Sequence, residues 1–482
     1  MESKSLAELK EACKVAGLPV SGTKAVLLQR LQEHEAKTKQ VASVNVNPML
    51  RSGSMASLRP KAISLFSGAG GDTLGLKRAG YDVVAFSEFK QPAIDTHLAE
   101  FPLSVLLKDP VSGSCDISKI PDSVFSPYHG TIDTMFMGCP CQSYSHGGKK
   151  DKYDPRGQLY HQGIRAVRLI QPKYVIFENV RGLLSRVAPE NDHPEPDMRK
   201  RPCVPVIENI RREFAKINYT ITYKVIDVEK IGVPQLRKRL ILIATPSPGN
   251  ERYPHMPWDN LPEASVPAST SIRGYLEPTL EGAVEYNVAK IPKDLDGRFW
   301  IQTDATAPTG TPHKNLVRLV NGIRNMSSKE LAAAGKGAKE RIVVVEKDGL
   351  ISFGRRAGGY HGEVVDPDAP SKTIICTYGL CPRLFVGLVN PTLGKYWIRT
   401  LTIRELGMIQ GFPGDYAWKG SVSEKITQIG NAVPPSLAER VARALGQITY
   451  CDTPQVVVGS EGGEGNDGGD GDEDEGSEGE SA

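Results

Sequence analysis

Two cysteines separated by one residue, Cys139 and Cys141, stand where a sulfur nucleophile could act. They belong to the loop GCPCQ (138–142), which directly follows an apolar stretch (131–137) that predicts a strand. A thiol at the carboxyl end of a strand, in a loop shaped by glycine and proline, has the exposure that a nucleophile needs. The alternative is a cysteine buried as a small apolar side chain, which would be inert.

A carboxylate follows another predicted strand. Glu178, in the tripeptide Glu178-Asn179-Val180, comes directly after the apolar run 174–177. Because ligands bind at the carboxyl ends of parallel strands, we expect this carboxylate to reach the same crevice as the cysteine loop. Partial burial there would raise its pKa and suit it to proton donation. The alternative is an anion that only neutralises a helix N-terminus.

Two arginines precede a further predicted strand, at 240–244, in the run QLRKR (235–239). Successive side chains of an extended chain point to opposite faces, so Arg237 and Arg239 share one face and Lys238 takes the other. Two guanidinium groups directed at one pocket would hold an anion or a base carbonyl. A solvated run of surface charge is the alternative.

A glycine loop, FSGAGG (66–71), lies between a predicted strand at 62–66 and a predicted helix at 73–79. Glycines let the backbone approach a ligand closely, and a helix N-terminus presents free N–H groups. Glu88 follows twenty residues after Gly68, at the end of the next predicted strand, where it could accept both ribose hydroxyls. The pair indicates an adenosine-containing cofactor, and the G-x-G-G spacing disfavours NAD.

These segments need a scaffold that brings strand ends together. From residue 60 the pattern alternates strand, turn and helix, with strands expected at 62–66, 83–86, 131–137 and 174–177. Such alternation predicts an α/β fold with a mostly parallel sheet and helices on both faces. In that fold the cysteine loop, Glu178 and the glycine loop would meet at one edge of the sheet.

Composition limits the setting in which this chemistry takes place. No apolar run approaches the ~20 residues needed to span a bilayer, and the first residues, MESKSLAELKEACK, lack the apolar core of a secretory signal. We therefore expect an intracellular protein with eight reduced cysteines. Because the cysteines show no C-x-x-C spacing, a structural zinc site is not expected.

Charge is unevenly distributed along the chain. Residues 459–482 hold ten acidic and no basic side chains, so the rest of the chain carries a net charge of +13 against +3 for the whole. A basic body suits a polyanionic partner, although a modest lysine and arginine excess is also compatible with an ordinary solvated surface. We expect the Gly/Glu/Asp/Ser-rich tail (451–482) to be disordered.

The N-terminal residues 1–36 predict two short helices. A capping box (5–8) opens the first helix and Gly17-Leu18-Pro19 closes it, while Val26, Leu27 and Leu31 form the apolar face of the second. The segment LAELKEACKVAGLPVSGTKAVLLQRL resembles a SAP module, a small helical family that binds DNA. Residues 37–59 lack periodicity and predict a flexible linker.

Taken together and in chain order, the chemical motifs resemble those of the cytosine-5 DNA methyltransferase family over about residues 61–447. The matching segments are Phe66–Gly71, Glu88, Asp116-Ile117, Pro140-Cys141, Leu159-Tyr160, Glu178-Asn179-Val180, Gln235 with Arg237 and Arg239, 399–405 and 428–434. The resemblance implies a Rossmann-like methyltransferase domain that uses S-adenosylmethionine, releases S-adenosylhomocysteine and needs no metal. It also implies a smaller, irregular target-recognition domain and double-stranded DNA as partner.

The same resemblance assigns roles to individual residues. Cys141 would add to carbon 6 of a flipped-out cytosine, Glu178 would protonate N3, and Arg239 with Arg237 would hold the base carbonyl. The residues expected to bind the cofactor are Phe66, Ser67, Gly68, Ala69, Gly70, Gly71, Glu88, Asp116, Ile117, Pro140, Leu159, Asn431 and Val433.

Four positions depart from the family pattern. Ser64 stands where aspartate is usual, Cys115 where glycine is usual, Cys139 where phenylalanine is common, and Ile231 where an aromatic is common. None of these changes removes a group that the reaction requires. They bear on cofactor affinity more than on reaction type.

The expected organisation is a SAP-like module (1–36), a linker (37–59), a first catalytic part (60–247), a target-recognition domain (248–395), a C-terminal return that completes the cofactor pocket (396–450) and the acidic tail (451–482). We expect a monomeric catalytic unit, located in the nucleus if the source is eukaryotic and otherwise in the cytoplasm or nucleoid. Two alternatives remain at this point. One is a transfer-RNA cytosine-5 methyltransferase, and the other is a catalytically silent DNA-binding scaffold.

Overall fold

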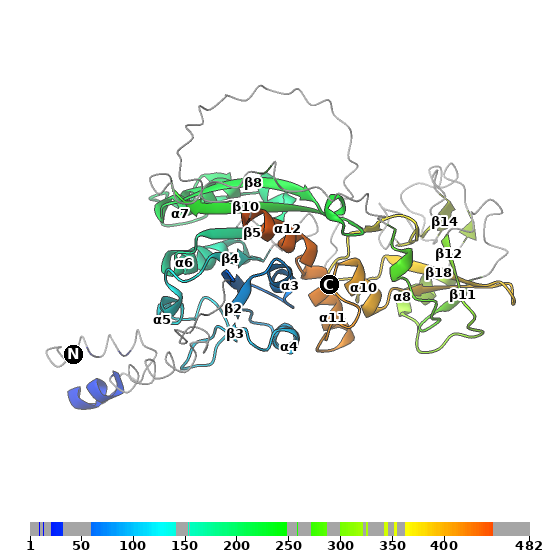
Figure 1. The fold of residues 1–482 in the computed structure, drawn as a ribbon, viewed down its shortest axis with the longest axis horizontal. Helices are drawn as coiled ribbons and strands as arrows, with labels where there is room; N and C mark the ends of the chain where they lie inside the picture. The colour runs from blue at the N-terminus through cyan, green and yellow to red at the C-terminus, as the bar shows by residue number, and fades with distance from the viewer. Residues whose placement is uncertain are drawn as a thin grey trace, which may run out of the picture.

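A computed structural model describes residues 9, 13, 21–31, 59–140, 153, 155–247, 258, 271–286, 299–321, 324–325, 342–345, 351–353 and 362–446. These residues form a seven-stranded sheet flanked by helices and a second sheet, with the C-terminal helices α10 and α11 between the two (Figure 1). Within this part of the chain, every helix is too short or too polar to traverse a lipid bilayer.

The central sheet has the strand order β3-β2-β1-β4-β5-β10-β8. Its strands are β1 (Lys61–Leu65), β2 (Asp82–Ser87), β3 (Val105–Leu106), β4 (Thr134–Met137), β5 (Tyr174–Val180), β8 (Tyr219–Asp227) and β10 (Lys238–Pro246). Neighbours from β3 to β5 are parallel, whereas β10 is antiparallel to β5 and β8. The predicted α/β fold with a mostly parallel sheet is confirmed.

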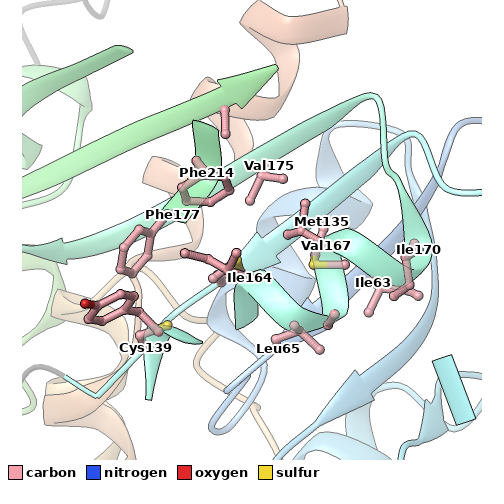
Figure 2. Packing of buried hydrophobic residues seen from close by; sticks show 14 of the residues in the cluster. Ile63, Leu65, Met135, Cys139, Ile164, Val167, Ile170, Val175, Phe177 and Phe214 are labelled. Atoms are coloured by element: carbon pink, nitrogen blue, oxygen red, sulfur yellow. The ribbon is translucent and has the colours of Figure 1, made fainter. Parts of the chain in front are cut away.

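Helices cover both faces of this sheet because alternate strand residues point to opposite sides. On one face, Ile164, Val167 and Ile170 of α6 (Tyr160–Ile170) pack with strand residues such as Met135 and Val175 (Figure 2). Each such buried apolar side chain contributes about 1.5–3 kcal/mol. The other helices near this face are α5 (Asp122–Phe125) and α7 (Val206–Lys216), and the short strands β6 (Val187–Pro189) and β7 (Cys203–Pro205) form a hairpin before α7.

The opposite face is covered by α3 (Gly71–Arg78) and α12 (Pro435–Gly446), which lie side by side although 356 residues separate the end of α3 from the start of α12 (Figure 1). Leu76 of α3 and Leu437 of α12 join Phe136 of β4 in this second core. The pairing requires a small residue, because a side chain at Gly75 would clash with the carbonyl of Pro435. The C-terminal return is therefore part of the catalytic domain's core. Helix α4 (Gln91–Glu100) follows β2.

The segment 248–395, which the sequence predicts to be irregular, contains in its described parts an eight-stranded sheet. Its strands are β11 (Val284–Tyr286), β12 (Trp300–Gln302), β13 (Arg324–Asn325), β14 (Ile342–Val345), β15 (Ile351–Phe353), β16 (Gly362–Val364), β18 (Leu384–Asn390) and β19 (Lys395–Thr400). Most of them are two to four residues long, too short to show an alternating pattern in the sequence. Strand β19 crosses the expected boundary at 395 because it pairs with β18.

Helix α8 (Lys314–Asn321) accompanies the second sheet, and α10 (Ile403–Ile409) and α11 (Val422–Asn431) follow it. Both α10 and α11 begin with a capping box, formed by Thr402 with Glu405 and by Ser421 with Glu424. In the N-terminal module, residues 24–31 are helical. Leu27 and Leu31 pack there with Leu9 and Cys13 as predicted, whereas Val26, expected on the same face, is exposed.

Candidate active site

The glycine loop leaves β1 through a left-handed residue and is tied to the end of β2. Phe66 has φ +57°, an unfavourable conformation for a side-chain-bearing residue. It persists because the Phe66 amide donates to Ser87 Oγ (3.1 Å) and the Ser67 amide donates to the Ser87 carbonyl (2.9 Å). Backbone strain held by several hydrogen bonds is characteristic of ligand-binding sites.

Glu88 lies beside this loop, as the sequence predicts. Its Oε2 accepts the amide of Gly68 (3.0 Å), and its Oε1 accepts the amides of Phe89 (2.8 Å) and Lys90 (2.9 Å). The carboxylate is thus oriented by backbone donors at the ends of β1 and β2. The two amides occupy both lone pairs of Oε1, whereas Oε2 has a second lone pair that can accept a hydroxyl.

The three glycines of the loop serve different purposes. A side chain at Gly68 would meet no atom within 4 Å, so the loop faces open space there. A side chain at Gly71 would clash with the carbonyl of Val433, and one at Gly70 would clash with Phe101 and His97. Gly68 therefore leaves room for a ligand, whereas Gly70 and Gly71 are required by packing inside the protein.

The C-terminal return reaches the glycine loop at two points. Val433 packs against Gly71 and lies near Gly138, the first residue of the cysteine loop. Tyr416, between α10 and α11, donates its hydroxyl to the carbonyl of Ala69 (2.5 Å). Asn431 is the last residue of α11 and is exposed. The fold thus brings Val433 to the predicted cofactor site and ends α11 just before it.

Asp116, Ile117 and Leu159 are placed by contacts outside the glycine loop. Asp116 accepts the amide (3.0 Å) and hydroxyl (2.7 Å) of Ser118, which stabilises a turn. Ile117 is buried in the core on the α6 side, and its carbonyl accepts a hydrogen bond from Arg165 (2.8 Å). Leu159 is the half-buried N-cap residue of α6. Their predicted contact with a cofactor remains a proposal.

The cysteine loop is described as far as Pro140, which is half-buried, and Cys141 lies outside the described residues. Asn179 donates through Nδ2 to the carbonyl of Cys139 (3.3 Å), which joins the loop to β5. The Cys139 side chain is buried, and burial together with the charge of Glu178 raises the pKa of its thiol well above the usual range. A neutral buried thiol is a poor nucleophile, so Cys139 is a packing residue.

Glu178 and Arg239 form a buried ion pair across β5 and β10. The sequence predicts that Glu178 follows its strand, but β5 continues to Val180, and Arg239 lies opposite Val180. Arg239 Nε and Glu178 Oε1 are 2.8 Å apart, and their side chains are 11% and 12% exposed. Burial raises the pKa of Glu178, while Arg239 and Arg237 oppose the rise. Burial therefore favours the protonated form of Glu178, while the two arginines favour its charged form.

Arg237 does not join Arg239 beside Glu178, where the alternation of side chains along the chain predicts it. Its guanidinium is 3% exposed and donates to the carbonyls of Ile374 (3.1 Å), Gly430 (3.3 Å) and Ala432 (3.2 Å). The reason is that Arg237 lies between β9 (Gln235–Leu236) and β10, where the chain leaves one strand and enters the next. These contacts join the C-terminal return to the segment of the second sheet, and the predicted role of Arg237 at a base carbonyl remains a proposal.

Gln235 reinforces the same junction. Its Nε2 donates to Gln410 Oε1 (2.7 Å), and Gln410 in turn donates to the carbonyl of Ala432 (2.8 Å). Strand β9 also pairs with β17 (Ser371–Lys372) in a separate two-stranded sheet, which links the segment before β10 to the segment between β16 and β18. The QLRKR run therefore contributes one residue to the Glu178 pair and two to the assembly of the site.

Sequence reasoning missed two contributors to the glycine loop, Tyr416 and Asp72. Asp72 is buried and accepts hydroxyl hydrogen bonds from Ser64 and Ser67. The aspartate at the second position of α3 is a visible sequence signal, but it is also an ordinary helix-start residue. Tyr416 gives no local signal, because its partner lies 347 residues away.

Among the residues that the structure describes, no group of three or more His, Cys, Asp or Glu side chains is arranged to hold a metal ion. The donor set around the loop instead fits an adenosine-containing cofactor. Gly68 faces open space, the N-terminus of α3 follows the loop, and Glu88 stands at the end of the neighbouring strand.

The chain is similar to known methyltransferases. The chain is 29% identical over 391 residues to the type II methyltransferase M1.HphI of Haemophilus parahaemolyticus, covering 80% of this chain and 86% of that protein. It is 28% identical to M.HgiBI of Herpetosiphon aurantiacus, covering 80% and 96%. A prophage-encoded DNA modification methyltransferase of Escherichia coli superposes with a TM-score of 0.50 at 22% identity, covering 81% of this chain and 99% of that structure.

Family models account for most of the sequence. The model of the C-5 cytosine-specific DNA methylases matches residues 60–447, which include the glycine loop, the Glu178–Arg239 pair and the C-terminal return. The SAP domain model matches residues 1–36. The chain therefore belongs to the C-5 cytosine-specific DNA methylase family and carries an N-terminal SAP domain.

Proposed function

We propose that this protein transfers a methyl group from S-adenosylmethionine to carbon 5 of cytosine in double-stranded DNA, with Cys141 as covalent nucleophile. The observation that carries the proposal is the buried Glu178–Arg239 pair, which lies beside the Cys139-Pro140 turn that leads to Cys141. Membership of the family supports the reaction class.

The cofactor would bind at the glycine loop. Gly68 leaves the space, Glu88 would accept the ribose hydroxyls, and Val433 would close the pocket from the C-terminal side. Asp116, Ile117, Leu159 and Asn431 would complete the pocket as the family resemblance implies. When bound, S-adenosylmethionine supplies an electrophilic methyl group, and the protein supplies its orientation.

The proposed chemistry makes carbon 5 nucleophilic by covalent addition. The Cys141 thiolate forms a bond to carbon 6 while the proton on Glu178 passes to N3, so that electron density moves to carbon 5. After carbon 5 has gained the methyl group, its proton leaves to a base. The sulfur–carbon bond then breaks, N3 returns its proton to Glu178, and the thiolate is restored. Every bond formed to the enzyme is broken again.

Two side chains have defined tasks in this scheme. Glu178 must carry a proton near neutral pH, and its burial favours the protonated form. Arg239 keeps the carboxyl in place and would hold the base carbonyl, because its ion pair uses one edge of a guanidinium that has further donors.

The substrate must reach this buried pair. Cytosine carbon 5 is not accessible to the site inside a duplex, so the base would be flipped out of the helix. The second sheet would contact the flanking bases, and the SAP domain would add a further DNA contact. In a eukaryotic cell, this substrate would place the protein in the nucleus.

The deciding experiment measures transfer of labelled methyl from S-adenosylmethionine to unmethylated DNA, followed by nucleoside analysis. We expect 5-methylcytosine in the wild-type digest and none with Cys141→Ser, while Cys139→Ser retains activity because its buried thiol takes no part. Label in transfer RNA but not in DNA would replace the substrate. No label in either, with intact DNA binding, would favour a silent scaffold.

A further inference from the structure

We propose that Asp72 is a positioning residue that fixes the glycine loop in its cofactor-binding shape, an inference that rests on the proposed function. Asp72 occupies the second position of α3 and is 1% exposed. Its Oδ1 accepts the hydroxyl of Ser67 in the loop (3.0 Å), and its Oδ2 accepts the hydroxyl of Ser64 on β1. One carboxylate therefore joins the loop to the strand before it and the helix after it.

The hydrogen-bonded chain continues past the carboxylate. Ser67 Oγ lies 3.3 Å from Thr73 Oγ1, which lies 3.0 Å from His97 Nε2 on α4. The His97 ring stacks on Phe86 of β2, with ring centroids 3.6 Å apart. The loop hydroxyl of Ser67 is thus the centre of a buried network that starts at β1 and ends at β2, on both sides of the crevice.

This network holds the part of the glycine loop where the backbone has positive φ angles. Phe66 has φ +57° and Gly68 has φ +55°, and the hydroxyl of the residue between them is the one that Asp72 holds. Glycine adopts this conformation freely, but a residue with a side chain, such as Phe66, remains in it only when its surroundings over-determine it. Without the bond to Asp72, Ser67 would still be tied by its amide to Ser87, but its hydroxyl would keep only the longer contact with Thr73 Oγ1 (3.3 Å).

A carboxylate at position 72 indicates a role in shaping the loop and not in stabilising the fold. Burial raises the pKa of Asp72 from 3.8 to about 6, so at neutral pH the protein maintains a buried charge that an amide of the same shape would avoid. An ionised carboxylate accepts through both oxygens, which the two serine hydroxyls require. An asparagine has one acceptor and would release one of them.

The groups that face Asp72 do not titrate in the same range. Burial lowers the pKa of His97 to about 3 and raises that of Tyr416 well above its usual value, so both stay neutral from pH 5 to 8. On the far side of α3, Glu439 and Arg443 of α12 pair with each other at 2.9 Å. A change in cofactor affinity near pH 6 that depends on residue 72 would therefore report the Asp72 proton.

The test compares Asp72→Asn, Ser67→Ala and the double variant by calorimetric binding of S-adenosylhomocysteine at pH 7.5. We expect each single variant to weaken binding about tenfold, about 1.4 kcal/mol, and the double variant to be no weaker than either, because both remove the same bond. In methyl transfer, Asp72→Asn should raise the KM for the cofactor more than it lowers kcat. Ser104→Ala, which removes another buried hydroxyl, is the control with unchanged binding.

Three further measurements separate positioning from a structural role. The midpoint of thermal unfolding of Asp72→Asn at pH 7.5 should equal or exceed that of the wild type, since the buried charge is gone. The exchange Ser64→Asp with Asp72→Ser restores a carboxylate to the pair and should recover most of the lost affinity. Wild-type affinity should fall as the pH drops through 6, and Asp72→Asn should show no such fall.

Asp72→Asn with wild-type affinity and pH profile would overturn the inference. So would an affinity loss that only parallels a loss of stability and is not recovered by the exchange. A wild-type protein that binds no S-adenosylhomocysteine under any condition would instead overturn the proposed cofactor, and with it the premise.

Discussion

Replacing Arg237 by methionine tests whether this residue assembles the site or acts on the substrate. Methionine keeps much of the side chain's length but removes every donor. Three backbone carbonyls, of Ile374, Gly430 and Ala432, would lose a partner in a region where Arg237 is 3% exposed. At about 1–1.5 kcal/mol for each buried hydrogen bond, we expect the free energy of unfolding to fall by about 3–5 kcal/mol.

The assay is urea unfolding of Arg237→Met beside Lys238→Met and Arg239→Met. Lys238 is exposed, so its variant should stay within about 0.5 kcal/mol of the wild type. Arg239→Met leaves Glu178 buried without its partner and should lose both stability and activity. Arg237→Met should also bind S-adenosylhomocysteine more weakly, because Ala432 precedes Val433, which packs against the glycine loop.

The refuting result is specific. If Arg237→Met keeps its unfolding free energy within about 1 kcal/mol of the wild type and binds the cofactor normally, yet loses turnover, then the guanidinium acts on the substrate. The alternation argument from the sequence would then be right, and the contacts of Arg237 in the structure would be secondary.

Four further predictions follow. Glu178→Gln should lower the rate of methyl transfer about 10²–10⁴-fold at saturating substrates, measured by label incorporation, with a circular dichroism spectrum like that of the wild type. Tyr416→Phe removes one hydrogen bond to the glycine loop and should weaken S-adenosylhomocysteine binding about fivefold, about 1 kcal/mol by calorimetry. The pKa of Asp72 is raised from 3.8 to about 6 on folding, so its stabilising contribution is present below pH 3.8 and is lost as the pH rises through 6. Urea unfolding of Asp72→Asn should therefore gain about 3 kcal/mol relative to the wild type between pH 4 and pH 7.5, and a constant difference would contradict the shift. Arg399→Met isolates Glu405, whose ion pair with Arg399 is fully buried, and should cost about 3–5 kcal/mol in unfolding free energy, more than the double variant in which Glu405→Leu is added.

The sequence alone was sufficient for the parts of the site that depend on short-range order. The glycine loop follows a strand, and Glu88 ends the next one, because both signals come from a strand and the turn after it. Parallel neighbours then bring such strand ends to one edge of the sheet. Arg239 and Glu178 also meet on one face, since alternation along β5 and β10 is a local property.

Other features depend on contacts that no local pattern encodes. The alternation of side chains in the sequence places Arg237 on the same face as Arg239. In the structure, however, its guanidinium donates to the carbonyls of residues 374, 430 and 432. Gly71 is explained by Val433, and Ala69 is held by Tyr416, both more than 340 residues away in the chain. The second sheet gave little signal, because most of its strands are shorter than the period over which amphipathic alternation can be recognised.

What the sequence by itself determined is therefore the reaction class and the residue types at each strand end, because these follow from local spacing and motif order. What only the tertiary structure decided is which of those side chains are available for chemistry. Burial keeps the Cys139 thiol neutral, and three backbone carbonyls accept the hydrogen bonds of the Arg237 guanidinium. Asp72 is joined to β1 and the glycine loop by the hydroxyls of Ser64 and Ser67. The physical reason is that burial and hydrogen-bond partners set the availability of a polar group, and both are supplied by distant parts of the chain.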